Sequence, residues 1–160
     1  MGEVNVKAIF DESFKTVTKK MTGLALKGTK TAAAKKECYE GLIHTKGQFA
    51  ADIRFVWNVS LYEYIASNMV RQDSLTEEEK ILYINEYMNI TCGHALSNIN
   101  NRMGPPPSRL SLPRIFHEEK PYESGCIEED TETEELCYDS EHGMMYVKIG
   151  WSSGKKGVEV

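Results

Sequence analysis

The sequence predicts an α+β fold in which an antiparallel sheet of five to six strands packs against three helices: one N-terminal, one short and one long. Two kinds of pattern support this prediction. Apolar residues recur at helical spacing in three segments, and residues typical of helix caps stand at their ends. Elsewhere, short runs rich in Val, Ile, Phe, Tyr and Trp alternate with turn-forming residues, as strands and hairpins do.

The first helix is indicated by five apolar residues that fall on one side of a helix. They are Val6, Phe10, Phe14, Val17 and Met21. Gly23 follows where a C-terminal cap is expected. The next segment, 22–36, contains mainly small and basic residues, and we interpret it as a connector or an irregular edge.

Two strands are predicted at 38–44 and 48–57, joined by a tight link in which Gly47 takes a positive φ. A short helix follows them. Its start is predicted from the capping-box pattern of Ser60 and Glu63, and Leu61, Ile65 and Met69 form its apolar stripe.

The long helix has the strongest end signals in the chain. Thr76 and Glu79 form a second capping-box pattern with acidic residues in the first turn, and Gly104 stands before three prolines at the other end. Beyond the prolines we expect a strand at 109–117. Segments 136–139 and 144–151 then form a second hairpin, which turns at Gly143.

Between these strands, the segment 118–135 holds nine acidic residues and one lysine. Because it offers little apolar surface to offset the entropy of ordering, we expect a mobile loop, with an acidic docking arm as the alternative. The segment 152–160 is expected to be a flexible tail. Residues 1–151 are therefore interpreted as a single domain.

Composition excludes several classes of protein. The chain has 160 residues, a net charge of −5 and an isoelectric point near 5.4. It lacks the basic stripe of a nucleic-acid-binding surface and any apolar run of the ~20 residues that a membrane-spanning helix needs. Its first 20 residues do not resemble a secretory signal, so a soluble, cytoplasmic protein is expected.

The cysteines and histidines do not form a metal-binding pattern. Four cysteines stand far apart without a C-x-x-C pair, and four histidines include no H-x-x-x-H pair. We therefore expect reduced thiols, with Cys126 the most exposed, and no metal site. His94 lies on the long helix, but it is expected to be a solvated or hydrogen-bonded imidazole.

The long helix separates into two faces at ~100° per residue. Its apolar face is expected to comprise Ile84, Met88, Cys92, Ala95 and Ile99. Glu86, Asn89, Gly93 and Ser97 lie on the opposite side. A glycine inside a helix costs about 1 kcal/mol relative to alanine, so Gly93 suggests that another backbone or a bulky partner comes close there.

The run from Glu86 to Ala95, with Glu-x-x-Asn followed by Gly and Ala, precedes a strand that opens with Leu110, Ser111, Leu112 and Pro113. This order resembles the signature of the CheX-type chemotaxis phosphatases, relatives of CheC, and the similarity extends over most of the chain. The family commonly has glycine before the glutamate, where this chain has Asn85. The acidic segment is also longer and more polar than the usual connection.

The resemblance implies a phosphatase that acts on the phospho-aspartate of a CheY-like receiver domain. In that role Asn89 orients the attacking water and Glu86 pairs with the receiver's lysine. Gly93, Asn85 and Ser97 are then expected to contact the partner. The resemblance also implies a homodimer formed through sheet edges. No cofactor of the chain's own is expected, because Mg²⁺ belongs to the receiver.

Two other classes of function remain open at this point. The chain is alternatively a binding module or adaptor that docks on a phosphorylated receiver without hydrolysing it. The third interpretation is a structural protein whose polar helix face is only solvated. A turnover assay and a binding assay separate the three.

Overall fold

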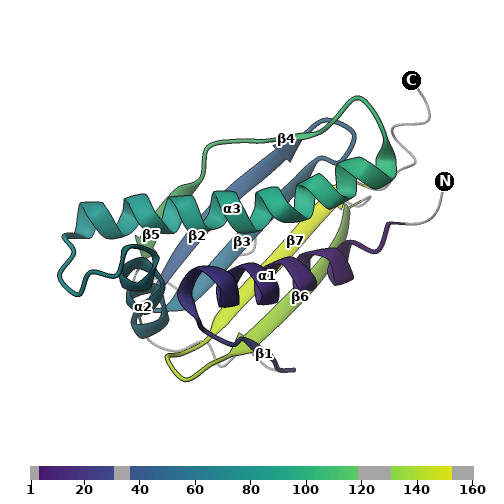
Figure 1. Cartoon of the computed structure of the whole chain (residues 1–160). Coiled ribbons are helices and arrows are strands. Elements are labelled where there is room, and N and C mark those ends of the chain that lie inside the picture. The colour runs from purple at the N-terminus through teal and green to yellow at the C-terminus, as the bar shows by residue number, and fades with distance from the viewer. Residues whose placement is uncertain (1–3, 31–36, 119–130, 153–160) are drawn as a thin grey trace.

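A computed structural model of the chain describes residues 4–30, 37–118 and 131–152. It contains three helices and seven strands within these ranges (Figure 1). In chain order the elements are α1 (Val6–Thr22), β1 (Lys27–Gly28), β2 (Cys38–Lys46), β3 (Ala51–Asn58), α2 (Val59–Val70), α3 (Glu77–Met103), β4 (Arg109–Leu110), β5 (Arg114–Glu118), β6 (Thr131–Asp139) and β7 (Met145–Ser152). The predicted α+β class is confirmed.

The strands form one antiparallel sheet in the order β1-β6-β7-β3-β2-β4, and β5 pairs with the same edge of β2 as β4. Both predicted hairpins are present, because β2 pairs with β3 and β6 pairs with β7. Helices α1 and α3 lie side by side over one face of this sheet, and α2 contacts both of them (Figure 1).

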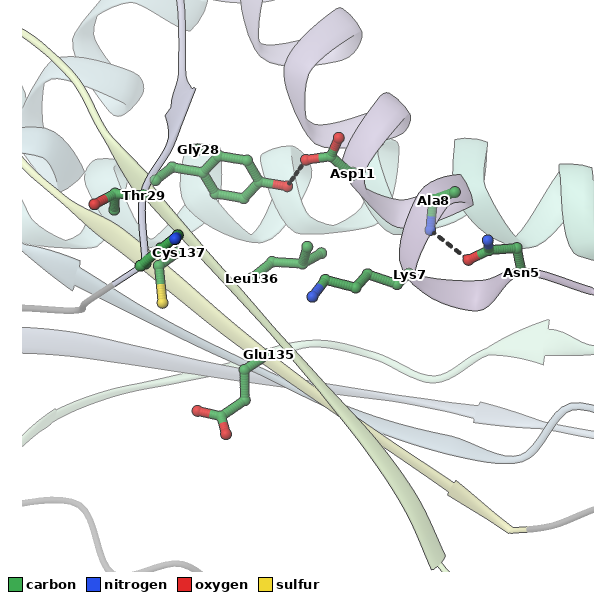
Figure 2. Close-up of a pocket in the computed structure, with 11 residues that line it drawn as sticks. Asn5, Lys7, Ala8, Asp11, Gly28, Thr29, Glu135, Leu136 and Cys137 are labelled. Atoms are coloured by element: carbon green, nitrogen blue, oxygen red, sulfur yellow. Dashed lines mark hydrogen bonds between the residues drawn. The ribbon is translucent and has the colours of Figure 1, made fainter.

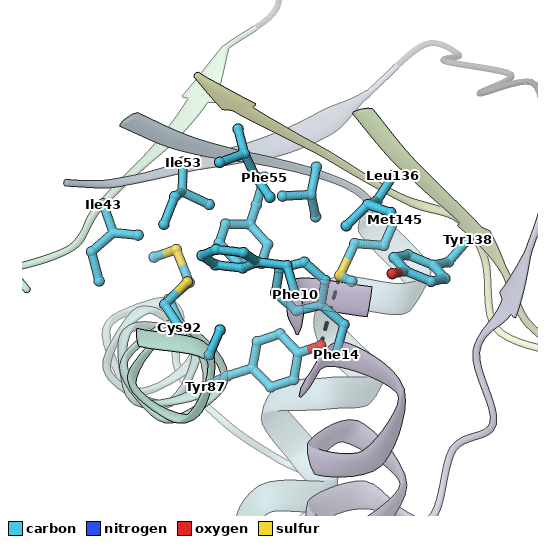
Figure 3. Packing of buried hydrophobic residues seen from close by; sticks show 14 of the residues in the cluster. Phe10, Phe14, Ile43, Ile53, Phe55, Tyr87, Cys92, Leu136, Tyr138 and Met145 are labelled. Atoms are coloured by element: carbon cyan, nitrogen blue, oxygen red, sulfur yellow. Dashed lines mark hydrogen bonds between the residues drawn. The ribbon is translucent and has the colours of Figure 1, made fainter. Parts of the chain in front are cut away.

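The core fills the space between the helices and this face of the sheet. Phe10 and Phe14 of α1 point toward the sheet, where Ile53 and Phe55 of β3 lie (Figure 3). Tyr87 of α3 extends toward Phe14 and places its hydroxyl 3.7 Å from Sδ of Met145 in β7. These six side chains are 0% exposed. Folding removes the apolar surface of these large side chains from water. This burial stabilises the packing of the helices against the sheet.

Two of the helix ends that the sequence predicts are confirmed by their caps. In α1, Gly23 caps the C-terminus with φ of 79°, in the left-handed region that glycine adopts readily. In α3, the Thr76 hydroxyl accepts a hydrogen bond from the N–H of Glu79, and the Glu79 carboxylate accepts one from the N–H of Thr76. These reciprocal bonds fix where α3 begins.

The predicted capping box of the second helix is wrong. Helix α2 begins one residue after Asn58, which makes no side-chain cap. Ser60 instead donates its hydroxyl proton to the carbonyl of His142 in the β6–β7 turn, 2.6 Å away. A tertiary hydrogen bond has therefore replaced the local one, which a sequence pattern cannot foresee.

Three predicted boundaries differ from the structure. The predicted strand 109–117 is split into β4 and β5, and β1 forms within the segment interpreted as a connector. The acidic segment is not a loop throughout: β6 begins at Thr131, and Glu118 ends β5. Residues 131–135 pair with β7 in a register that places Glu135 opposite Lys148, so cross-strand pairing offsets their low hydrophobicity.

Some predictions concern residues outside the described ranges. They include Cys126, the part of the acidic segment at 119–130 and the tail after Ser152. The extent of the predicted domain stays a prediction. Within the described ranges, the helices do not reach the length and apolar character needed to cross a membrane.

Candidate functional site

Helix α3 carries the predicted site, and its apolar face is as expected. Ile84, Met88, Cys92, Ala95 and Ile99 are all 0% exposed. Burial raises the pKa of the Cys92 thiol, so this thiol stays protonated and serves as an apolar filler. Anchoring five positions of one stripe in the core fixes the rotation of α3 and therefore which side chains face outward.

The opposite face presents two adjacent rows of residues spaced four apart. One row contains Asn85, Asn89, Gly93 and Ser97, and the next contains Glu86. Glu86 and Ser97 are exposed, whereas Asn85, Asn89 and Gly93 are half-buried. The structure therefore brings the five predicted site residues onto one surface, as the helical spacing indicated.

Glu86 and Asn89 are neighbours one turn apart, and neither is engaged by the rest of the described chain. Among the residues that the structure describes, no hydrogen bond or ion pair involves either side chain. A free carboxylate thus stands beside a free amide, which offers one acceptor and two donor positions. This pairing can bind a cation and orient a small polar molecule at the same place.

Asn85 differs from its neighbours because its side-chain oxygen is inaccessible to solvent. That oxygen has no hydrogen-bond partner among the described residues, although the residue as a whole is half-buried. The side chain thus points partly inward. Its expected contact with a partner stays a prediction.

Gly93 faces the edge of the sheet rather than open solvent. A methyl group added there would lie 3.6 Å from Cδ1 of Leu110 in β4, an ordinary contact distance. The close neighbour suggested by the glycine is thus one flexible side chain, the sole contact within 4 Å from the described residues outside this stretch of α3. Leu110 itself is held by the pairing of β4 with β2 and by a hydrogen bond from the N–H of Ser111 to the carbonyl of His44.

Sequence reasoning missed several apolar residues beside this pair. Leu82 and Ile90 lie one turn before and one turn after Glu86 in the same row, and they are 62% and 37% exposed. Leu112, between β4 and β5, is 86% exposed. Their position on the helix could have identified Leu82 and Ile90. The core stripe of α3 is already complete, so apolar residues on its other side are not needed for folding.

The remaining titratable candidates are engaged in structural contacts. His94 is exposed, and its Nδ1 lies 3.2 Å from the Ser13 hydroxyl, whose proton is donated to the carbonyl of Thr91. His142 stacks on Tyr64 with ring centroids 3.8 Å apart. Across the described ranges, no group of three His, Cys, Asp or Glu side chains is arranged to hold a metal ion.

A separate pocket lies between α1 and the strands β1 and β6, with a volume of about 470 Å³ (Figure 2). None of its lining residues belongs to α3. Two of its polar groups already satisfy each other, because the Tyr138 hydroxyl donates to the Asp11 carboxylate at 2.6 Å. The pocket therefore adds nothing to the surface around Glu86 and Asn89.

Comparison with known proteins identifies the fold. No family model matches the chain, and no curated protein matches it by sequence. Among solved structures, a chemotaxis protein CheX from Vibrio vulnificus matches with a TM-score of 0.78 and 19% identity, over 95% of this chain and 99% of that chain. The chain has the CheX fold.

Two further structures with the CheX fold support the same assignment. A CheC-like superfamily protein from Shewanella sp. PV-4 matches with a TM-score of 0.77 and 19% identity, over 95% of this chain and all of that one (100%). The CheX chain of a CheX–CheY–BeF₃–Mg²⁺ complex from Borrelia burgdorferi matches at 0.75 and 12% identity, over 94% and 100%. The predicted resemblance is confirmed for the fold.

Proposed function

We propose that this chain is a phosphatase that hydrolyses the phospho-aspartate of a CheY-like receiver domain. The observation that carries the proposal is the unengaged pair of Glu86 and Asn89 on the outer face of α3, in a chain with the CheX fold. A CheX protein of this fold has been solved together with CheY, BeF₃ and Mg²⁺. The partner of the present chain is, on this proposal, a receiver of the same kind.

The chemistry demands little of the phosphatase itself. An acyl phosphate is already labile, so the main requirement is to hold one water in line with the phosphorus atom. The receiver supplies the Mg²⁺ and the lysine that stabilise the phosphoryl oxygens and the leaving carboxylate. Asn89 is suited to the remaining task, since its amide oxygen accepts a hydrogen bond from the attacking water while its nitrogen donates to a phosphoryl oxygen.

Glu86 takes an anchoring role rather than that of a base. It stands one turn before Asn89 and is exposed, so it can pair with the receiver's lysine while Asn89 reaches the phosphoryl group. The pair fixes the position of α3 on the receiver. Catalysis then depends on the placement of α3 and not on proton transfer by Glu86.

The experiment that tests this function is the lifetime of a phosphorylated receiver from the same organism, measured with and without the chain. A phosphatase at substoichiometric concentration shortens the lifetime about tenfold or more, which corresponds to about 1.4 kcal/mol of barrier. A chain that binds the phosphorylated receiver but leaves its lifetime unchanged is an adaptor. That outcome would contradict the proposed chemistry.

A further inference from the structure

Four large apolar side chains are exposed in the described part of the chain. They are Ile81 (39% exposed), Leu82 (62%), Ile90 (37%) and Leu112 (86%). Ile81 lies in line with Ile99 and so extends the core stripe toward the start of α3. We call the other three residues the apolar rim: Leu82 and Ile90 are on α3, and Leu112 lies on the segment between β4 and β5, which runs beside α3 (Figure 1).

Two rim residues flank the polar pair of the candidate site along the helix. Leu82 and Ile90 stand on either side of Glu86 in its own row, about 6 Å away at 1.5 Å of rise per residue. Leu112 is two residues after Leu110, whose Cδ1 lies beside the position of Gly93, one turn beyond Asn89. The polar pair therefore has an apolar side chain on each side along α3, and a third stands on the neighbouring segment.

Folding does not explain these exposed side chains. The stripe from Ile84 to Ile99 already anchors α3 in the core, and the rim residues on α3 lie outside it. Clusters of exposed apolar side chains on a folded domain commonly mark an interaction surface. Scattered apolar residues carry no such meaning, but Leu82 and Ile90 lie directly on either side of Glu86.

We propose that the apolar rim is the contact surface for the phosphorylated receiver, and that it excludes bulk water from the docked Glu86 and Asn89. This inference rests on the proposed function and specifies its interface. The partner is a receiver that presents apolar side chains around its active-site lysine. With water excluded, the attraction between Glu86 and the lysine becomes stronger, and the water held by Asn89 is separated from the solvent.

Charge favours a receiver over a second copy of this chain as the occupant. A two-fold dimer across the same patch would bring Glu86 close to Glu86 of the other copy, within an apolar surround. Like charges juxtaposed in such an interface are strongly unfavourable. A receiver lysine supplies the opposite charge that the exposed, unengaged carboxylate lacks.

The test replaces the rim without changing the helix. Leu82→Gln combined with Ile90→Gln removes apolar area at two exposed positions while keeping residues of good helix propensity. The matched control, Leu82→Met with Ile90→Leu, keeps the exposed apolar surface area at both positions. Affinity is measured by calorimetry against a CheY-like receiver from the same organism, activated with beryllium fluoride and Mg²⁺, and thermal unfolding confirms that each variant folds.

We expect the double glutamine variant to bind about 100-fold more weakly, roughly tenfold for each anchor, and the control to bind as the parent does. This loss should be nearly the same at low and high salt. The loss caused by Glu86→Gln, in contrast, should shrink as salt rises, because screening weakens an ion pair. The salt series therefore separates the apolar and ionic contributions.

A double glutamine variant with the affinity of the parent would overturn the rim proposal. So would a variant that lost self-association in sedimentation while keeping its affinity for the receiver, since a second copy would then occupy the patch. Neither result bears on the water-orienting role of Asn89, which is measured by turnover. The rim and the proposed chemistry can thus fail separately.

Discussion

At the scale of single residues, Gly93 lowers the stability of α3, and we ask whether this glycine is kept because a partner docks there. The structure leaves room for a methyl group there, 3.6 Å from Leu110 Cδ1. Gly93→Ala should therefore raise the free energy of unfolding by up to about 1 kcal/mol, because alanine is the better helix former. Thermal or denaturant unfolding measures this change.

The larger substitution Gly93→Leu tests whether a partner approaches the same position. On the proposed docking, the added bulk should raise the apparent KM for the phosphorylated receiver while the protein remains folded. Gly93→Ala serves as the control for helix stability. A folded Gly93→Leu variant with unchanged KM would place the contact surface elsewhere.

Residue-level prediction succeeded where one helix determines the geometry. The spacing of Glu86, Asn89 and Gly93 predicts a shared outer face because the 3.6-residue period is local, and the structure confirms that placement. The side-chain oxygen of Asn85 is inaccessible to solvent, and the expected contact of Asn85 with a partner stays a prediction. That orientation depends on neighbouring elements, which the sequence does not specify.

At the scale of elements, α3 is positioned by a glycine that sequence analysis did not single out. A methyl group at Gly41 in β2 would lie 2.6 Å from Sδ of Met88 and 2.9 Å from Cη2 of Trp57, so α3 packs directly on the strand there. Gly41→Ala should lower the free energy of unfolding by about 1–3 kcal/mol through overpacking.

The matched measurement compares Gly41→Ala with Gly93→Ala in the same unfolding assay. Both add one methyl group, one in the tight contact between α3 and β2 and one at ordinary contact distance from Leu110 of β4. We expect opposite signs. Equal or higher stability of Gly41→Ala would mean that Met88 and Trp57 move aside easily, and that the close packing does not fix the position of α3.

Helix boundaries could be predicted where the cap is local, as at Thr76 and Gly23. The prediction failed where a distant group competes for the capping side chain, as at Ser60, whose hydroxyl donates a hydrogen bond to the carbonyl of His142 instead. The start of β6 was missed for a similar reason. Residues 131–135 are polar, and only their pairing with β7 makes them a strand.

At the scale of the whole molecule, the sequence predicts the two hairpins but not their arrangement in the sheet. Strand β7 lies between β6 and β3, which are distant in the chain, and β5 returns to the edge of β2. Such pairings depend on contacts that have no local pattern. The expected homodimer stays a prediction.

The central claim is that Asn89 orients the attacking water on a receiver's phospho-aspartate. It is tested most directly by the dephosphorylation rate at saturating phosphorylated receiver, with the parent chain and with Asn89→Ala. The account predicts a rate lower by about 100-fold or more, or about 2.7 kcal/mol of barrier, with unfolding nearly unchanged. A folded Asn89→Ala variant that dephosphorylates the receiver at the parent's rate would contradict it.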